Sequence, residues 1–192
     1  MREMIRLFIA IDLPEGVKDV LAETAVALAQ NIPHRAVRWV TRPQMHLTLR
    51  FLGDTAVSQL PTLQDELTQL ATRYQPFQLR LRDVGAFPNQ KRPRVVWAGL
   101  AGDLAPLQNL QAEIEDQVVA LGWEREKRPF SPHLTLGRVQ DANAARGLNW
   151  AVKLEAVRFG VTAVQLVQSE LRPSGAVYSL RHQVGLNQYA GA

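Results

Sequence analysis

The chain of 192 residues contains no cysteine. That absence excludes a disulfide framework, a thiolate nucleophile and any zinc or iron–sulfur site built on cysteine. It also has no apolar run close to the roughly 20 residues that cross a membrane. The apolar run that begins at Ile5 is stopped by Asp12 and lacks the small-residue cleavage site of a signal peptide. We therefore expect a cytoplasmic protein with no membrane partner.

Two common catalytic signatures are missing as well. The sequence has no Gly-x-Ser-x-Gly nucleophile elbow and no Gly-rich phosphate-binding loop. The charge is only mildly unbalanced, because 22 Lys and Arg against 18 Asp and Glu give a formal net charge of +4. This bias is compatible with an anionic substrate but is too weak to indicate a duplex DNA partner.

Hydrophobic periodicity predicts an α+β protein with antiparallel sheets and no flexible linker. The two halves have a similar layout, which indicates two similar lobes about an approximate two-fold axis, with helices outside and a central cleft. We expect residues 1–192 to form a single bilobal domain and a monomer. Strands are predicted over residues 5–13, 37–40, 45–52, 77–84, 95–100, 133–139, 153–169 and 176–184, and helices over residues 14–30, 57–74, 104–121 and 141–150.

One tetrapeptide, His-Leu-Thr-Leu, occurs twice, at residues 46–49 and 133–136. Because side chains alternate along a strand, the His and Thr of each copy share one face and the two Leu point to the other. The leucines then anchor each strand in a core, and the imidazole and hydroxyl stand side by side on an open face. We expect the two copies to face each other across the cleft.

Two histidines on opposite sides of a phosphorus atom can supply both proton transfers of an in-line displacement. Histidine titrates near neutral pH, so one imidazole can act as base while the other acts as acid. The hydroxyls of Thr48 and Thr135 are predicted to bind non-bridging oxygens and to stabilise the charge that grows in the transition state. This pattern indicates a phosphodiester substrate, although a single His-x-Thr in a strand would be ordinary surface.

A metal site is the main chemical alternative, but zinc catalysis usually needs three protein ligands and the motifs supply two. We therefore expect no metal and no cofactor. The remaining histidines, His34 in a loop and His182 in the last strand, are interpreted as structural or exposed to solvent.

These residues resemble the 2H phosphoesterase superfamily, which is named for two His-x-Thr-x motifs. Within it, the chain is similar to the bacterial and archaeal RNA 2′,3′-cyclic phosphodiesterases, also called 2′-5′ RNA ligases. The resemblance covers nearly the whole chain. It includes residues 7–14 (LFIAIDLP), 46–53 (HLTLRFLG), 85–88 (GAFP), 92–99 (RPRVVWAG) and 132–138 (PHLTLGR).

The resemblance implies a two-lobed, metal-independent enzyme that opens an RNA 2′,3′-cyclic phosphate with water and leaves a 2′-phosphate. Some members of the family join tRNA halves through a 2′-5′ bond. By this analogy, His46 is the general acid that protonates the departing 3′ oxygen, and His133 is the general base that takes a proton from water. Thr48 and Thr135 would bind phosphate oxygens, and Arg138 would pair with phosphate.

Three further features are candidates for RNA binding. Arg50 falls on the His/Thr face if its strand is regular, with solvated surface as the alternative. Phe8 is a candidate to stack on a terminal base, with core packing as the alternative. The basic loop 91–94 and the basic stretch 125–128 are candidates to guide an RNA strand, although such charge runs are usually only solvated faces.

Two other functions stay open from the sequence. A related enzyme acting on 2′-5′ oligonucleotides or small nucleotide cyclic phosphates would use the same protein chemistry. A non-catalytic RNA-binding module would need only basic loops and an exposed aromatic side chain. Binding alone does not need a matched pair of histidines, so the catalytic hypothesis is favoured.

Overall fold

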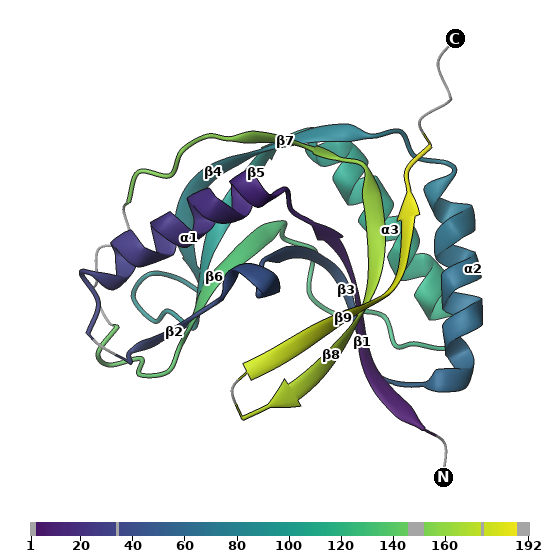
Figure 1. Ribbon diagram of the computed structural model, residues 1–192, viewed down its shortest axis with the longest axis horizontal. Helices are drawn as coiled ribbons and strands as arrows, with labels where there is room; N and C mark the ends of the chain where they lie inside the picture. The colour runs from purple at the N-terminus through teal and green to yellow at the C-terminus, as the bar shows by residue number, and fades with distance from the viewer. Residues whose placement is uncertain (1–2, 34, 146–151, 174, 188–192) are drawn as a thin grey trace.

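A computed structural model describes residues 3–33, 35–145, 152–173 and 175–187 (Figure 1). The chain builds two antiparallel sheets, as predicted for an α+β protein. The first sheet has the strand order β3-β1-β8-β9 and the second has the order β2-β6-β5-β4-β7. The strands are β1 (Met4–Asp12), β2 (Val37–Trp39), β3 (His46–Ala56), β4 (Phe77–Phe87), β5 (Val95–Gly102), β6 (His133–Val139), β7 (Arg158–Val161), β8 (Ala163–Arg172) and β9 (Gly175–Gly185).

Three α-helices and two short 3-10 helices complete the described part of the chain. Each α-helix buries one apolar stripe at helical spacing, such as Leu63, Leu67 and Leu70 on the second helix, so packing against a sheet stabilises it. The helices are α1 (Glu15–Ala29), α2 (Leu60–Ala71) and α3 (Leu104–Ala120), and the 3-10 helices are η1 (Arg42–Gln44) and η2 (Val57–Gln59).

The two sheets define two lobes with matching strand order. The first lobe comprises strands β3-β1-β8-β9 with α2 and α3, and the second comprises strands β2-β6-β5-β4-β7 with α1 (Figure 1). Starting from the strand that carries the tetrapeptide, β3-β1-β8-β9 corresponds to β6-β5-β4-β7, with β2 added at the edge of the second sheet. The predicted duplication is therefore present in the topology.

The helices connect the lobes. α1 follows β1 of the first sheet but contacts β6 of the second, whereas α3 follows β5 of the second sheet but contacts β3 of the first. One cluster of buried side chains includes residues from both sheets, among them Leu47 and Leu134. The lobes consequently share a core.

Several boundaries differ from the sequence-based expectation, and three of these differences change the layout of the fold. β3 continues past Gly53 to Ala56, because Gly53 adopts a φ of +70° and the pairing with β1 extends to Met4 opposite Ala56. The predicted strand at 153–169 is two strands, β7 in the second sheet and β8 in the first, and the chain changes sheet between them. In the predicted helix 141–150, residues 142–145 form turns instead, and residues 146–150 lie outside the described part.

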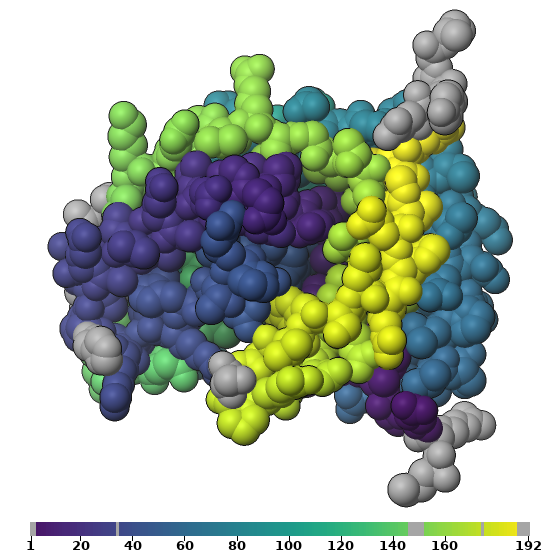
Figure 2. Space-filling model, viewed as in Figure 1, coloured from purple at the N-terminus to yellow at the C-terminus, as the bar shows by residue number. Residues whose placement is uncertain are grey.

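The lobes meet around a hollow. A cavity of about 230 Å³ is lined by Asp12 and Pro14 at the junction of β1 and α1, and by Gln165 of β8 and Gln183 of β9, among others. Figure 2 shows a hollow between the violet surface of α1 and the yellow surface of β9. No helix in the described ranges is long and apolar enough to span a membrane.

Candidate active site

The two tetrapeptides lie on strands that contact each other where the lobes meet. β3 and β6 each begin at the motif histidine, and the two strands are in contact. All four motif leucines are buried, while both histidines and both threonines are partly exposed. The alternation predicted for the tetrapeptides is therefore present in both copies.

His46 is held by both of its ring nitrogens. Nδ1 lies 2.8 Å from the backbone oxygen of Gln44, and Nε2 lies 2.9 Å from Oγ1 of Thr48. A carbonyl oxygen only accepts, so Nδ1 carries a proton, and Nε2 of the neutral ring accepts from the Thr48 hydroxyl. Nε2 is thus the atom that can exchange a proton with a substrate.

Burial lowers the pKa of His46 to about 4. The Gln44 carbonyl and the Asp12 carboxylate oppose this shift, and the positive charges of Arg138 and Lys18 add to it. The imidazole is consequently neutral at pH 7 in the free protein, and a bound anion would favour its protonated form.

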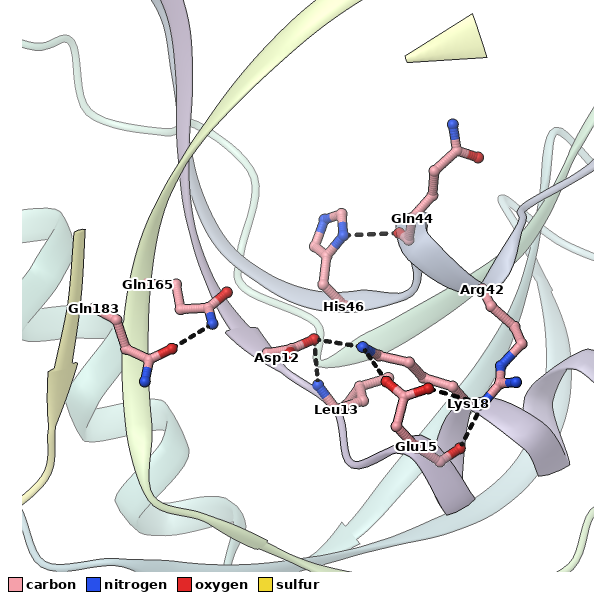
Figure 3. A network of polar contacts seen from close by, with 9 residues as sticks. All are labelled: Asp12, Leu13, Glu15, Lys18, Arg42, Gln44, His46, Gln165 and Gln183. Carbon is pink, nitrogen blue, oxygen red and sulfur yellow. Dashed lines mark hydrogen bonds and ion pairs between the residues drawn. The ribbon is translucent and has the colours of Figure 1, made fainter. Parts of the chain in front are cut away.

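A polar network supports the backbone that holds His46 (Figure 3). Lys18 Nζ lies 2.9 Å from Asp12 Oδ1 and 3.1 Å from Glu15 Oε1. Although burial disfavours its charge, its bonds to both carboxylates raise the pKa of Lys18. Arg42 of η1 also binds Glu15, at 2.8 Å. The network thereby anchors η1, whose last residue, Gln44, offers its carbonyl to the imidazole.

His133 is oriented in the same way in the second lobe. Its Nδ1 lies 2.7 Å from the backbone oxygen of Ser131, so Nδ1 again carries the proton and Nε2 of the neutral ring is an acceptor. Burial lowers the pKa of His133, the Ser131 carbonyl opposes the shift, and Arg138 adds to it. In both copies, a carbonyl two residues before the histidine fixes the same tautomer.

Arg138 lies between the two histidines in electrostatic terms. Its charge contributes to the lowering of the pKa of His46 in the first lobe and of His133 in the second. Burial raises the pKa of Tyr178 in the first lobe, and the charge of Arg138 opposes that shift. Arg138 is exposed on β6, and its charge acts on groups of both lobes. It would also attract an anion bound near the two imidazoles.

The same irregularity follows both motifs. In the pairing of β1 with β3, Ala10 lies opposite Thr48 and Ile9 opposite Arg50, so Leu49 is an extra residue. In the pairing of β5 with β6, Trp97 lies opposite Thr135 and Val96 opposite Gly137, so Leu136 is the extra residue. A bulge shifts the alternation by one position, and this places Phe51 and Arg138, rather than Arg50 and Gly137, on the His/Thr face.

Arg50 is therefore not on the face where a regular strand would put it. It is 9% exposed, and its Nε lies 2.6 Å from Oε2 of buried Glu115 on α3. Its guanidinium also donates to the backbone oxygens of Phe51 and Glu124. The structure thus contradicts a substrate-binding role for Arg50 and shows a buried ion pair that joins β3 to α3.

Phe8 is on the predicted face but is only 2% exposed. Its ring centroid lies 4.7 Å from that of His46, 5.0 Å from Tyr178 and 5.9 Å from Phe51. These rings cover Phe8, so it supports the site from beneath and cannot stack on a base. Of the expectations for this residue, core packing is correct.

Several further residues of the site were not predicted from the sequence, although Phe87 and Trp97 lie in stretches that carry the family resemblance. Tyr178 of β9 packs edge-on against His46, with centroids 5.3 Å apart, and Phe87 of β4 packs edge-on against His133 at 5.0 Å. Trp97 lies next to Phe87, and its indole Nε1 is buried without a hydrogen-bond partner among the described residues. These side chains come from strands far from the motifs in sequence, and only the sheet pairing brings them together.

The two basic segments differ in their surroundings. In loop 91–94, Lys91, Arg92 and Arg94 are exposed, and the oxygen of Arg94 accepts a bond from the backbone of Val139, next to Arg138. In the stretch 125–128, Arg125 pairs with Asp116 at 2.6 Å. Loop 91–94 is therefore placed beside the site, and the charge of Arg125 is partly neutralised.

His182 is not part of this arrangement. His182 lies near α2, where its Nε2 is 3.0 Å from Oγ1 of Thr68. His34 lies outside the described residues. In the part of the chain that the structure describes, no group of three His, Asp or Glu side chains is placed to hold a metal ion.

The sequence similarity to several known proteins extends over nearly the whole chain. A protein of Thermus thermophilus named RNA 2′,3′-cyclic phosphodiesterase is 36% identical over 206 residues, which cover 97% of this chain and 96% of that protein. A protein of Methanothermobacter thermautotrophicus with the same name is 32% identical over 179 residues, which cover 91% and 95%.

Comparisons with solved structures and with a family model indicate the same family as these relatives. TT0787 of Thermus thermophilus superposes with a TM-score of 0.78 at 32% identity, covering 96% of this chain and all of that one. LigT of E. coli, solved with 3′-AMP, has a TM-score of 0.74 at 30% identity, with 97% and 100% covered. Residues 17–173 match the family described as the 2′-5′ RNA ligase superfamily. The chain belongs to the 2′-5′ RNA ligase superfamily.

Proposed function

We propose that the protein is an RNA 2′,3′-cyclic phosphodiesterase that hydrolyses the cyclic phosphate at an RNA end to a 2′-phosphate. The observation that carries the proposal is the pair of equivalent histidines, each with Nδ1 fixed by a backbone carbonyl and Nε2 left to exchange protons. The relatives named RNA 2′,3′-cyclic phosphodiesterase support this choice of substrate.

In the proposed mechanism, His133 acts as the general base and His46 as the general acid. Nε2 of neutral His133 takes a proton from water as the water oxygen attacks phosphorus, and the bond from phosphorus to the 3′ oxygen breaks. Nε2 of protonated His46 gives its proton to that oxygen. Burial disfavours protonated His46 in the free protein, so the negative charge of the bound phosphate must raise its pKa.

The non-bridging oxygens are proposed to bind Thr48, Thr135 and Arg138. The two hydroxyls share a face with the histidines, and Arg138 lies close enough to lower the pKa of both imidazoles. In the free protein the Thr48 hydroxyl donates to His46 Nε2, and protonation of that imidazole releases the hydroxyl to donate to the phosphate instead. Donors aimed at the growing charge stabilise the transition state. We propose that the reaction needs neither a metal nor a cofactor, because the two imidazoles supply both the acid and the base.

The exposed loop 91–94 beside Arg138 is proposed to contact the RNA backbone.

Because one chain supplies both histidines, the enzyme is proposed to act as a monomer. With the 5′ hydroxyl of a second RNA in place of water, the same displacement would form a 2′-5′ phosphodiester and release the 3′ oxygen, and tRNA halves are the proposed substrates of such ligation. We propose that both lobes form a single domain, since they share one core.

The direct test is incubation with an RNA that ends in a 2′,3′-cyclic phosphate, in the presence of a metal chelator. We expect a product with a 2′-phosphate, identified by its resistance to enzymes that remove only 3′-phosphates. A panel of 2′-5′ oligonucleotides and mononucleotide cyclic phosphates distinguishes the alternative substrates. No turnover with any of these compounds, despite RNA binding, would instead indicate a binding module.

A further inference from the structure

The open face of the first sheet carries an apolar row that runs across all four strands. Phe51 of β3 lies opposite Phe8 of β1, Phe8 lies opposite Val167 of β8, and Val167 lies opposite Leu180 of β9. The inner two side chains are 2% and 7% exposed, whereas Phe51 and Leu180 at the ends are 56% and 55% exposed. We call these four residues the apolar row.

The apolar row is continuous with the candidate active site. Phe8 touches the His46 ring, with centroids 4.7 Å apart, and touches Phe51 on the same sheet face at 5.9 Å. Tyr178 packs against both Phe8 and His46. A ligand that extends from His46 along this face therefore meets rings and methyl groups next.

A cation accompanies the apolar row. Arg6 is exposed and lies two residues from Phe8 on β1, so its side chain leaves the same sheet face. Its charge is close enough to oppose the upward pKa shift of Tyr178. An exposed aromatic ring with a nearby cation suits a single RNA strand, because bases stack on the ring and phosphates pair with the cation.

We propose that the exposed end of the apolar row at Phe51 binds the base that precedes the reacting nucleotide in the RNA, and that this base stacks on the Phe51 ring. The Phe8 ring lies against both His46 and Phe51, with centroids 4.7 and 5.9 Å away. A phosphate held at His46 and a base stacked on Phe51 would therefore be separated by the width of one ring, and we assign that base to the nucleotide next to the one that carries the phosphate. The inference rests on the proposed function and adds to it that the substrate is an oligonucleotide.

The test compares a mononucleotide 2′,3′-cyclic phosphate with a trinucleotide that ends in the same group. For Phe51→Ala, we expect KM for the trinucleotide to rise about tenfold, as loss of one stacked base predicts, while kcat and the mononucleotide kinetics stay unchanged. Phe51→Trp restores the low KM because it keeps an aromatic face, and Phe51→Leu does not. Val26→Ala removes a similarly exposed side chain, 62% exposed, from α1 and serves as the control.

Each outcome separates the two proposals. If wild type and Phe51→Ala hydrolyse the trinucleotide with equal KM, the inference on Phe51 is overturned and the proposed function stands. If wild type hydrolyses neither substrate, both proposals fall. If Phe51→Ala changes the sedimentation of the protein but not KM, the row is a protein interface, and the assignment to RNA is overturned.

Discussion

The two strands that carry the His-Leu-Thr-Leu tetrapeptides have an extra residue at the same position, but different side chains follow it. In the first lobe, Arg50 turns inward to Glu115 and Phe51 turns to the open face. In the second lobe, Gly137 turns inward and Arg138 turns to the open face. The same β-bulge thus places an aromatic ring on the open face of one lobe and a cation on the open face of the other.

The inward position of the second strand has no room for a side chain. A Cβ at Gly137 would lie 2.6 Å from Cγ1 of Val37 and 3.0 Å from the Trp39 ring, because β2 packs there. At the equivalent place, Arg50 reaches Glu115 on α3. The lobes keep the same His and Thr pair, while the residues after it differ: Arg50 packs inward in one lobe, and Arg138 presents a charge in the other.

The largest expected effect tests whether the two histidines are equal in role. His46→Ala and His133→Ala are each expected to lower kcat by roughly 10²–10⁴-fold, because each removes one proton transfer. Circular dichroism verifies folding, and His182→Ala, a histidine bound to Thr68 near α2, is the control expected to keep full activity.

The residual activities of these variants distinguish acid from base. In His133→Ala, the remaining requirement is protonated His46, so kcat/KM should fall as the pH rises above the His46 pKa of about 4. In His46→Ala, the requirement is neutral His133, whose pKa is lowered from the usual value of 6.5, so kcat/KM should rise with pH, with its midpoint below pH 6.5. The opposite slopes would exchange the two roles.

A second test concerns the inward residue of the first lobe. Arg50→Met leaves the Glu115 carboxylate buried without its partner, which is expected to lower the free energy of unfolding by about 3–5 kcal/mol. The double variant Arg50→Met/Glu115→Leu should recover much of this loss, and the folded fraction should keep its kcat. Urea unfolding measures the stability. A loss of kcat at unchanged stability would return Arg50 to the substrate site.

The smallest effect concerns the outward residue of the second lobe. Arg138→Gln removes a charge that lowers the pKa of both histidines, so both imidazoles should titrate at higher pH in NMR spectra. The control is Arg73→Gln, which removes the charge of an arginine that follows α2 and pairs with Glu113. This variant should leave both histidine titrations unchanged. A shift of only one histidine would place Arg138 in one lobe's site rather than between the two.

Much of the site could be predicted from sequence because period-two alternation is a local property. It assigned His46, Thr48 and their counterparts to one face and the leucines to the core. Alternation failed after the tetrapeptide, since a bulge is an outcome of pairing with a neighbouring strand and leaves no composition signal. The role expected for Arg50 was wrong for this reason.

Contacts between distant strands were also beyond sequence reasoning. The burial of Phe8 depends on Tyr178, which is 170 positions away along the chain and joins the sheet through β8. The division of residues 153–169 depends on which partner each half finds, β4 for β7 and β1 for β8. Periodicity predicts a strand but not the sheet to which it belongs.

The exchange of helices between the lobes has a mechanical consequence. The chain passes from one lobe to the other between β1 and α1, β2 and β3, α2 and β4, β5 and α3, α3 and β6, and β7 and β8. No single hinge can therefore open the space between the histidines, because every one of these connections would have to bend together. The spacing of the two histidines is therefore set when the protein folds, and a substrate must fit the space between them as it stands.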